Sequence, residues 1–445
     1  MVQVKINTNK RYLFPCEISI VNYAGKILVI APEYANWIVL DSANQQEVFE
    51  YLRQGHTIEE TLNNTFNECD VNHVVCQLEA RQFCSKVIHN SVDEERNMHL
   101  YLTNKCNLSC PHCYMYSGKS VQAELTTNEI MELIHNYKSI ANGTKITISG
   151  GEPTIRPDFE EIIKYATGIG LSIKLLTNGS LFSKARVDKL SKYISSVQIS
   201  IDGFSEESNA PIRGEGHFQK ALETIECFIV NGVETSIAIT PPYTLIKSHV
   251  DDYVAFAKCL INKYSSHNFC VKFAEGLSDG RSIKPTRKEN EEYSKIVKLI
   301  QKQIYGYEYD FINFVQVMQN DIITDNCMFG VFAVTSNGDV YLCPEIGKLH
   351  PIANIKKDLF KDIYEKALDA ERATSVNKLR PCKDCELRYI CGGGCRIEEF
   401  TGVAEISSFK NIQIDAIQPR ECGKEQKEKF YELMINSNEY LFKGQ

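Results

Sequence analysis

The sequence predicts an α/β protein whose centre is a partial (β/α)6 TIM barrel. Between Met98 and about Ser278, stretches typical of strands alternate with amphipathic helices, with roughly thirty residues from one strand to the next. A group of three short strands and three helices precedes this region, and a cysteine-rich region from Cys327 to Cys422 follows it. We therefore expect three units in the 445 residues, with a helical link before the last.

The first unit, residues 1–92, is expected to be a small winged-helix-like domain. Turn residues separate its expected strands, Glu17–Val21, Lys26–Ala31 and Asn36–Leu40. Ser42 and Asn44 precede a first helix, Thr57 opens a second with Glu60 three residues later, and Asp70 is expected to cap a third. Apolar residues recur in these helices at helical spacing: Val48, Phe49, Leu52, Val75, Leu78 and Phe83.

The second unit, residues 93–285, contains six expected strands. They are His99–Thr103, Lys145–Ser149, Ser172–Thr177, Ser196–Ile201, Glu234–Thr240 and Phe269–Ala274. Helices such as Asn128–Ile140 and Phe218–Val230 lie between them. Six βα units suit a partial barrel, which leaves a side open for a bulky substrate, and the chemistry of a parallel barrel belongs in the loops after its strands. A helical link, residues 286–326 with a helix over Thr286–Gln303, leads to the third unit, residues 327–445.

The amino-acid composition indicates the cellular compartment and excludes some classes of binding partner. A net charge of −8 without runs of like charge predicts no nucleic-acid partner and no membrane surface. Residues 1–20 lack the unbroken apolar core of a signal peptide, so we expect a cytoplasmic protein. Its seventeen cysteines then favour metal binding or catalysis over disulfides. Seven scattered cysteines are expected to be buried small apolar residues: Cys16, Cys69, Cys76, Cys84, Cys227, Cys259 and Cys270.

Cys106, Cys110 and Cys113 form a Cys-x3-Cys-x2-Cys loop after the first barrel strand. Three thiolates can hold three irons of a four-iron cluster and leave the fourth iron without a protein ligand, whereas an electron-transfer cluster is normally closed by four cysteines. The alternative is zinc, because Cys-x2-Cys is also half of a common zinc site. Zinc would need a further pair of ligands beyond the loop.

The segment Cys106-Asn-Leu-Ser-Cys110-Pro-His-Cys113-Tyr closely resembles the radical S-adenosylmethionine (SAM) family. The resemblance implies a SAM-binding [4Fe-4S] cluster on Cys106, Cys110 and Cys113. It implies that a glycine-rich loop, Ser149, Gly150, Gly151 and Glu152, contacts SAM, with Glu152 accepting from the SAM ammonium. It also implies that Ser200 and Asp202 contact the ribose and that Arg213 pairs with the SAM carboxylate. The ring of His112 is expected to lie near the adenine. Taken singly, each could be a turn, a cap or a surface charge.

The cysteine-rich region resembles the SPASM extension of peptide-modifying radical SAM enzymes, which carries auxiliary iron–sulfur clusters. The resemblance implies two [4Fe-4S] clusters: auxiliary I on Cys327, Cys343 and Cys395, and auxiliary II on Cys382, Cys385, Cys391 and Cys422. Auxiliary I lacks one cysteine of the fully ligated pattern, and Asp321 lies near that position. Either Asp321 or another group completes the site, or one iron is open to a substrate thiolate. A pair of zinc ribbons is the alternative.

The first unit resembles the PqqD-like element that binds the leader of ribosomally made precursor peptides; the alternative is an extension without a ligand. Together the resemblances imply a peptide maturase that uses a 5'-deoxyadenosyl radical, with a flavodoxin- or ferredoxin-type reductant and an auxiliary cluster as electron acceptor. The missing auxiliary ligand favours a Cys thioether product. Alternatives are a sulfatase-type maturase, another peptide crosslink, an epimerisation, or a non-catalytic iron–sulfur protein. No histidine or carboxylate is assigned as a catalytic acid or base.

Overall fold

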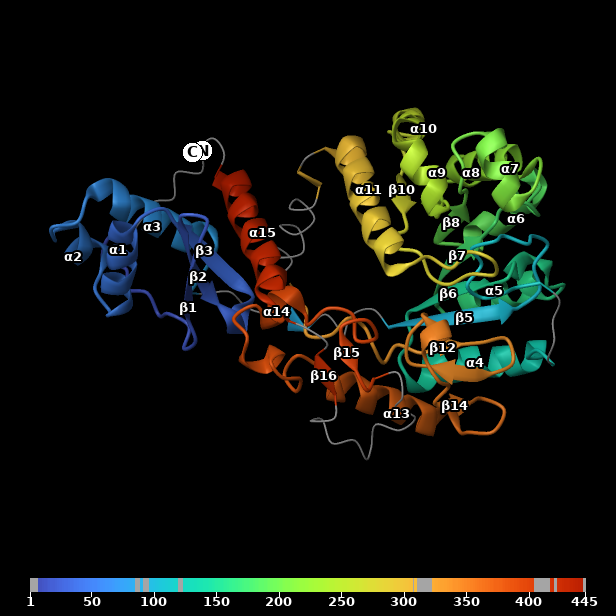
Figure 1. The fold of residues 1–445 in the computed structure, drawn as a ribbon. Helices are drawn as coiled ribbons and strands as arrows, with labels where there is room; N and C mark the ends of the chain where they lie inside the picture. Colours follow the sequence, from blue (N-terminus) through green and yellow to red (C-terminus); the bar gives the residue numbers. More distant parts are fainter. Residues whose placement is uncertain are drawn as a thin grey trace.

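The computed structural model describes residues 7–84, 89–90, 96–118, 123–306, 308–309, 322–403, 417–419 and 422–442. It is an α/β structure whose main sheet has nine strands, most of them parallel. Figure 1 shows this sheet with its helices on one side of the molecule and a small three-stranded sheet on the other. The helices α14 (Arg388–Cys391) and α15 (Lys424–Phe442) lie between them.

Six parallel strands form the first part of the main sheet and follow one another in sequence order. They are β5 (Asn97–Thr103), β6 (Lys145–Gly150), β7 (Ser172–Thr177), β8 (Ser196–Ser200), β9 (Glu234–Ile239) and β10 (Phe269–Phe273). Every expected strand is present with its bounds shifted by at most two residues. Their carboxyl ends therefore meet at one edge of the sheet, where the loops that carry the predicted SAM contacts emerge.

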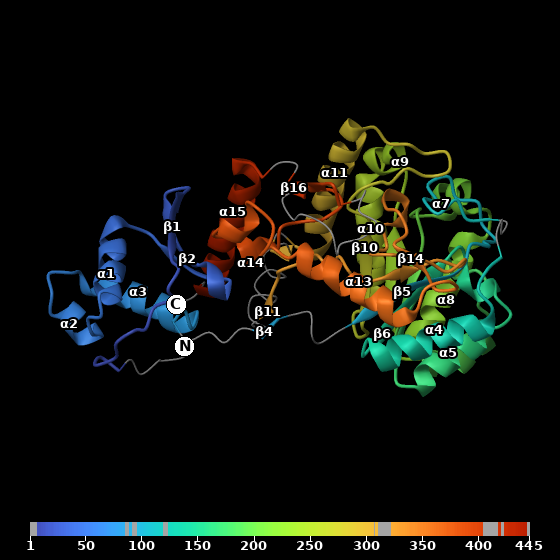
Figure 2. The same cartoon turned by 90° about the horizontal axis from the view of Figure 1, so that it is seen from below.

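The helices of the βα units lie along one side of this sheet (Figure 2), as right-handed crossovers require. They are α4 (Thr127–Ile140), α5 (Phe159–Gly168), α6 (Lys184–Leu190), α7 (Glu206–Arg213), α8 (His217–Val230), α9 (Tyr243–Ser248) and α10 (Val250–Lys263). The helix α11 (Arg287–Tyr305) follows β10. In α4, Thr126 and Glu129 form a capping box at the start, and Ile130, Leu133, Ile134 and Tyr137 are buried at helical spacing.

The cysteine-rich region begins inside the same sheet. The short strand β12 (Ala333–Val334) pairs in parallel with β5, and β13 (Asp339–Tyr341) and β14 (Ala353–Asn354) continue the sheet in antiparallel fashion. After them come α13 (Phe360–Ala373), α14 (Arg388–Cys391), the pair β15 (Phe400–Thr401) and β16 (Gln418–Pro419), and α15 (Lys424–Phe442). A further pair joins β4 (His89–Asn90) to β11 (Ile322–Ile323). Backbone hydrogen bonds between β12 and β5 thus join the start of the third unit to the second unit.

The N-terminal unit has the expected order of three strands and three helices. It consists of the antiparallel strands β1 (Ser19–Tyr23), β2 (Lys26–Ala31) and β3 (Asn36–Leu40), and of α1 (Ala43–Arg53), α2 (Ile58–Leu62) and α3 (Glu68–Ala80). The expectation that Asp70 caps the third helix was wrong: Asn67 is the cap, and its Oδ1 accepts from the backbone N–H of Cys69 at 2.8 Å. Asp70 lies in the first turn, where its negative charge complements the helix dipole.

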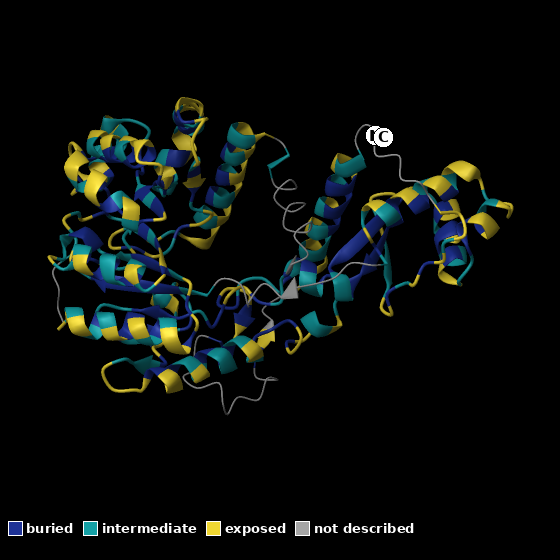
Figure 3. Ribbon diagram, turned by 180° about the vertical axis from the view of Figure 1, so that it is seen from behind, coloured by how far each residue is buried: buried dark blue, intermediate teal, exposed yellow. Residues whose placement is uncertain are grey.

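Both faces of β2 and β3 in the small sheet are buried. One face packs on α1 and α3 through Val29 and Ile38, and the other packs on α14 and α15 through Leu28 and Trp37. Figure 3 shows β2 and β3 mostly in the colour of buried residues. The two buried faces explain why β2 and β3 read as unbroken apolar runs instead of alternating patterns.

The expectation that the scattered cysteines are buried was wrong for the four exposed ones, whereas Cys84 and Cys227 are partly buried against the apolar cores. Four of them are exposed and three are partly exposed: Cys16, Cys69, Cys76 and Cys259, then Cys84, Cys227 and Cys270. On α3, the buried side chains include Val71, Val74 and Leu78, so Cys69 and Cys76 project from the opposite face. All seventeen cysteines are free thiols. Within the described ranges, no helix combines the length and apolar character needed to cross a membrane.

Candidate functional site

The predicted cluster-binding loop leaves the carboxyl end of β5 and returns to its own base. Lys105 and Gly118 form a β-bridge, the N–H of Cys106 donates to the carbonyl oxygen of Gly118 at 3.2 Å, and Gly118 donates back to Asn104 at 2.9 Å. Within the loop, the N–H of Cys113 donates to the carbonyl oxygen of Cys110 at 3.2 Å. The loop is therefore a closed turn that keeps its three thiols on one short segment.

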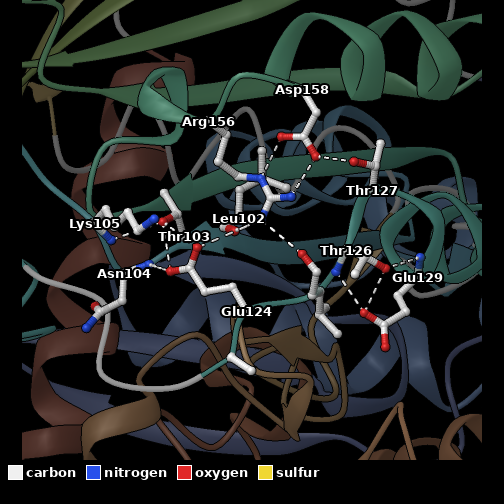
Figure 4. Close-up of polar contacts among 12 residues, drawn as sticks. Leu102, Thr103, Asn104, Lys105, Glu124, Thr126, Thr127, Glu129, Arg156 and Asp158 are labelled. Atoms are coloured by element: carbon white, nitrogen blue, oxygen red, sulfur yellow. Dashed lines mark hydrogen bonds and ion pairs between the residues drawn. The ribbon is translucent and has the colours of Figure 1, made fainter.

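Glu124 and Arg156 fix the base of this loop (Figure 4). Glu124 accepts from the Thr103 hydroxyl at 2.8 Å and from the Asn104 N–H at 2.9 Å. Arg156 donates to the Leu102 carbonyl oxygen at 3.1 Å and is held in a two-point ion pair by Asp158, at 2.9 and 2.6 Å. Because the pair with Asp158 orients the guanidinium, the end of β5 is fixed before the cysteines begin.

Gly150 and Gly151 allow the next loop to approach the cysteine loop. A Cβ on Gly150 would lie 2.3 Å from the carbonyl oxygen of Thr103, and one on Gly151 would lie 2.2 Å from that of Lys105. Because the two loops lie this close, the N–H of Gly151 donates to the carbonyl oxygen of Thr103 at 2.8 Å. The sequence predicted that these glycines would approach the ligand; here they are required by the approach of two backbone loops. Ser149 is the next-to-last residue of β6 and pairs with Tyr101 of β5.

Glu152 is fully buried, and the protein itself uses both of its carboxylate oxygens. One oxygen accepts from the N–H and hydroxyl of Thr154 and from the Thr177 hydroxyl at 2.8 Å; the other accepts from the Asn178 N–H at 2.8 Å. Burial raises the pKa of Glu152, and these hydrogen bonds oppose the increase. In this arrangement Glu152 joins the loop after β6 to the loop after β7.

Asp202 and Arg213 form a buried ion pair beside the cysteine loop. Arg213 Nε donates to Asp202 Oδ2 at 2.6 Å, and the other oxygen of Asp202 accepts from the N–H of Thr240 at 2.9 Å. The His112 Nε2 atom lies 3.3 Å from the same Oδ2. Burial opposes the charge on Arg213, whereas Asp202 and the thiols of Cys110 and Cys106 favour it, so the pKa of Arg213 is raised overall. Ser200, two residues before Asp202, ends β8 and pairs with Ala238.

A buried network that sequence reasoning missed connects these loops. The backbone carbonyl oxygen of Asn178 accepts from His217 Nε2 at 2.9 Å, and His217 Nδ1 lies 3.1 Å from Asn209 Nδ2. The Asn209 Oδ1 atom accepts from the N–H groups of Asp202 and Gly203 at 3.1 and 3.2 Å. Asn209 therefore presents its amide donors to His217, which must be neutral with its proton on Nε2. Burial lowers the pKa of His217 to about 4.

The segment after β10 also holds the cysteine loop, and no motif pointed to it. Ser282 donates its N–H to the carbonyl oxygen of Pro111 at 2.9 Å, and the Arg281 guanidinium donates to the carbonyl oxygen of Ser117. A Cβ on Gly280 would lie 2.5 Å from the carbonyl carbon of His112. The only sequence signal was a turn-forming Asp-Gly pair, which does not reveal its partner.

The three loop thiols suit a shared cluster. Cys106 interacts electrostatically with Cys110 and Cys113, and Cys110 also interacts with Arg213. Burial raises the pKa values of Cys106 and Cys110, so cluster binding would displace their protons. Among the described residues, no group forms a hydrogen bond with the buried Nδ1 atom of His112, which leaves a polar atom for a ligand. The residues present therefore fit a three-thiolate cluster and a bound small molecule.

The four cysteines assigned to auxiliary II line one cavity of about 290 Å³. They come from a 3-10 turn and its C-cap, from the end of α14 and from the segment just before α15: Cys382, Cys385, Cys391 and Cys422. Burial raises the pKa values of Cys382 and Cys385 to about 11. Lys427, paired with Glu386 at 2.9 Å, also lines the cavity and interacts with Cys385 and Cys422. Four thiols around one cavity fit a fully ligated cluster.

The auxiliary I cysteines also come together. Cys343 interacts with Cys327 and Cys395, and burial raises the pKa of Cys343 to about 12. Asp321 lies outside the described residues, so its predicted part in this site stays a prediction. Tyr101 of β5 donates to the carbonyl oxygen of Pro344 at 2.6 Å, next to Cys343. Among the described residues, no three histidine, cysteine or acidic side chains surround a point as ligands of a single metal ion.

Comparison with known families identifies two matching regions. The profile of the radical SAM superfamily matches residues 100–257, which span β5 to α10. The profile of SPASM, an iron–sulfur cluster-binding domain, matches residues 326–386. The first region contains the cysteine loop and the Asp202–Arg213 pair, and the second contains four of the seven cysteines assigned to auxiliary clusters.

Curated relatives cover most of the chain at moderate identity. The mycofactocin maturase MftC of Mycobacterium tuberculosis is 27% identical over 339 residues, which cover 72% of this chain and 81% of MftC. An AdoMet-dependent heme synthase of Methanosarcina barkeri is 29% identical over 329 residues, covering 68% of this chain and 92% of the synthase. The solved structure of anSMEcpe with bound AdoMet shares the fold, with a TM-score of 0.55 and 21% identity over 77% of this chain and 95% of that one.

Proposed function

We propose that this chain, which carries a radical SAM domain that binds SAM with a [4Fe-4S] cluster and a SPASM domain that binds auxiliary iron–sulfur clusters, modifies a ribosomally synthesised precursor peptide. The observation that carries the proposal is the continuity of the main sheet. The cysteine loop follows β5, and β12 of the SPASM region pairs directly with β5. The relative MftC is itself a maturase, which supports a peptide substrate over a small molecule.

The chain's own residues would divide the SAM site into a charged side and a backbone side. Arg213, held by Asp202, supplies a fixed positive charge suited to the SAM carboxylate, and His112 offers its unpartnered Nδ1. Ser149, Gly150, Gly151 and Ser200 would line the backbone side. When bound, the cluster and SAM supply a 5'-deoxyadenosyl radical that abstracts a hydrogen atom. Glu152 would act mainly through the loop it holds, because its oxygens already accept four hydrogen bonds.

The auxiliary sites would hold two further [4Fe-4S] clusters, which makes three per chain. Cys382, Cys385, Cys391 and Cys422 would close auxiliary II around their shared cavity. Cys327, Cys343 and Cys395 would hold auxiliary I and leave one iron for another ligand. A flavodoxin- or ferredoxin-type protein would supply electrons in the cytoplasm.

The sheet β5 to β10 would form a partial barrel that is open to the part of the peptide to be modified.

The N-terminal unit would bind the leader of the precursor peptide as a PqqD-like, winged-helix-like element. An extended peptide adds most readily to a free sheet edge. At β3, the carbonyl oxygens of Trp37 and Val39 already accept from Arg81 at 3.1 Å and His73 at 3.4 Å. The edge of β1, which pairs with β2 alone in the described residues, is therefore the edge we favour for the leader.

The finer proposal is a thioether between a cysteine sulfur and a carbon of the same peptide. Its formation breaks one S–H and one C–H bond and makes one S–C bond, so the peptide loses two hydrogens. The C–H hydrogen would go to the 5'-deoxyadenosyl radical, the S–H hydrogen would leave as a proton, and an auxiliary cluster would accept the remaining electron. A sulfatase-type oxidation, another crosslink or an epimerisation are the alternatives. The relation to a heme synthase makes a tetrapyrrole the alternative substrate of another class.

Two measurements test this function. Anaerobically reconstituted protein with dithionite and SAM should form 5'-deoxyadenosine, and it should contain about twelve irons per chain, as three four-iron clusters require. Co-expression with a cysteine-containing precursor peptide should lower the peptide mass by two hydrogens, and alkylation should show one cysteine thiol fewer per crosslink. An unchanged mass with an altered residue configuration would indicate an epimerase. An unmodified peptide together with a converted iron porphyrin would contradict the proposal.

A further inference from the structure

Arg396, directly after Cys395, is a fully buried arginine with 0% exposure. Its guanidinium donates only to backbone carbonyl oxygens: those of Thr374 at 2.6 Å, Gly392 at 2.9 Å, Gly394 at 2.6 Å and Asp325 at 3.2 Å. Within the described ranges, its guanidinium forms no direct ion pair, and the side chain of Asp325 accepts from the Ser375 hydroxyl at 3.2 Å. A buried guanidinium without a carboxylate is costly unless other negative charge compensates it.

The negative charge around Arg396 comes mainly from the cysteines of both auxiliary sites, and the Asp325 carboxylate contributes less than any of them. The guanidinium interacts electrostatically with Cys327 of auxiliary I and with Cys382 and Cys391 of auxiliary II. The backbone N–H of Arg396 also donates to the Cys327 sulfur at 3.4 Å. Arg396 thus interacts with ligands of both auxiliary sites. Its positive charge lies close to the negative charge that thiolate-bound clusters would have.

The local backbone is built around this side chain. Gly392, Gly393 and Gly394 have φ angles of +66°, +78° and +71°, a left-handed turn that side chains rarely tolerate. A Cβ on Gly393 would lie 2.9 Å from Arg396 Nη1. The three glycines therefore wrap the chain closely enough around the guanidinium for two of their carbonyl oxygens to accept from it.

We propose that Arg396 is a positioning residue shared by the two auxiliary sites, whose buried positive charge makes the reduction potentials of both clusters more positive. Reduction adds one electron from the reductant to a cluster without breaking a bond, and it increases the negative charge near Arg396. A fixed cation in a low-dielectric interior stabilises that added charge. The inference rests on the proposed assignment of the auxiliary ligands.

The test compares Arg396→Met and Arg396→Lys in full-length protein in which Cys106, Cys110 and Cys113 are replaced by alanine. The parent protein should hold about eight irons, as two four-iron clusters require. Redox titration followed by electron paramagnetic resonance then reports the auxiliary clusters alone. We expect Arg396→Met to lower the equilibrium constant for their reduction at least tenfold, about 59 mV for one electron. Arg396→Lys should stay within about threefold, because it keeps the charge.

The control is Arg372→Gln on α13, which removes an arginine whose side chain is 73% exposed and should leave both potentials unchanged. Unchanged potentials in Arg396→Met at full iron content would overturn the inference, and so would equal shifts in the Met and Lys variants. If Arg396→Met loses iron, recovery of iron in Arg396→Lys supports the charge, and no recovery refutes it. A parent protein without iron would refute the auxiliary assignment as well, which separates the two failures.

Discussion

The Nε atom of Arg213 donates to Oδ2 of Asp202 at 2.6 Å, so the two residues act as a pair beside the cysteine loop. The sequence suggested one contact to the SAM carboxylate and one to the ribose. In the structure, both carboxylate oxygens of Asp202 accept hydrogen bonds from protein groups: Oδ2 from Arg213 and Oδ1 from the N–H of Thr240. Its clearest function is to orient Arg213 and to balance its charge in a buried site.

Replacement of Asp202 by asparagine should therefore reduce SAM cleavage mainly through Arg213. Loss of one partner of a buried ion pair costs about 3–5 kcal/mol, part of which we expect to appear as weaker SAM binding. We predict at least a tenfold higher KM for SAM in an assay of 5'-deoxyadenosine, with iron content retained. Asp188→Asn is a matched control, because Asp188 Oδ1 accepts from Asn231 at an exposed site. An unchanged KM would show that Arg213 does not need this partner.

Gly151→Ala should disrupt the cysteine loop without altering any ligand. The new Cβ would lie 2.2 Å from the carbonyl oxygen of Lys105, so one of the two loops must move. We expect loss of most of the iron bound by the first cluster, about four irons per chain, and loss of 5'-deoxyadenosine formation. Gly168→Ala, in α5 with nothing within 4 Å of its Cβ, should retain both. Equal iron contents in the two variants would contradict the backbone role of Gly151.

The auxiliary II assignment predicts a selective effect of Cys422. Cys422→Ala removes one of four thiols that line the cavity and should lower iron content by up to about four atoms per chain. Cys259→Ala removes an exposed thiol on α10 and should leave iron content unchanged. Iron and sulfide analysis after anaerobic reconstitution decides between them. If both variants keep all their iron, Cys422 is not a ligand.

Regular elements could be predicted because they depend on local patterns. The capping box at Thr57 marks the start of α2, and the alternation of strands and helices places each βα unit. Relations between distant residues could not be predicted in this way. The pairing of the two-residue strand β12 with β5 leaves almost no pattern, and Trp37 meets Met434 across 397 positions.

The sequence predicted which residues belong to the site but not which of them contact one another. The motifs placed Glu152, Asp202 and Arg213 in one region, and the structure brings them close to the cysteine loop. That Asp202 binds Arg213, or that Asn178 and His217 connect the loops, depends on distances between neighbouring strand ends. Arg281 follows a strand without any motif, so only the fold shows that it holds the loop.

His217 should make the stability of the protein fall with acid. Its pKa is lowered from 6.5 to about 4 in the folded state, so the unfolded state binds more protons between these values. Stability is therefore present above pH 6.5 and is lost as the pH falls toward 4. Between pH 7.5 and 5.5 the loss is about 1.4 kcal/mol from this histidine. Thermal unfolding of His217→Gln should show a smaller loss over that range, whereas an exposed His135→Gln control should match the parent.

Trp37 should couple the N-terminal unit to the rest of the enzyme. Its indole Nε1 donates to the carbonyl oxygen of Met434 in α15 at 3.2 Å, and its ring is fully buried between the two units. Trp37→Phe removes this bond, a loss of about 1 kcal/mol, and leaves a smaller ring. If the N-terminal unit presents the leader, modification of the full precursor should slow several-fold while peptide-independent SAM cleavage stays constant. Val230→Ala, at a 75% exposed position of α8, should change neither rate. The strand β3, which contains Trp37, lies on the opposite side of the molecule from β5, which precedes the cysteine loop (Figure 1). An equal decrease of both rates would therefore indicate general destabilisation and would contradict a coupling role.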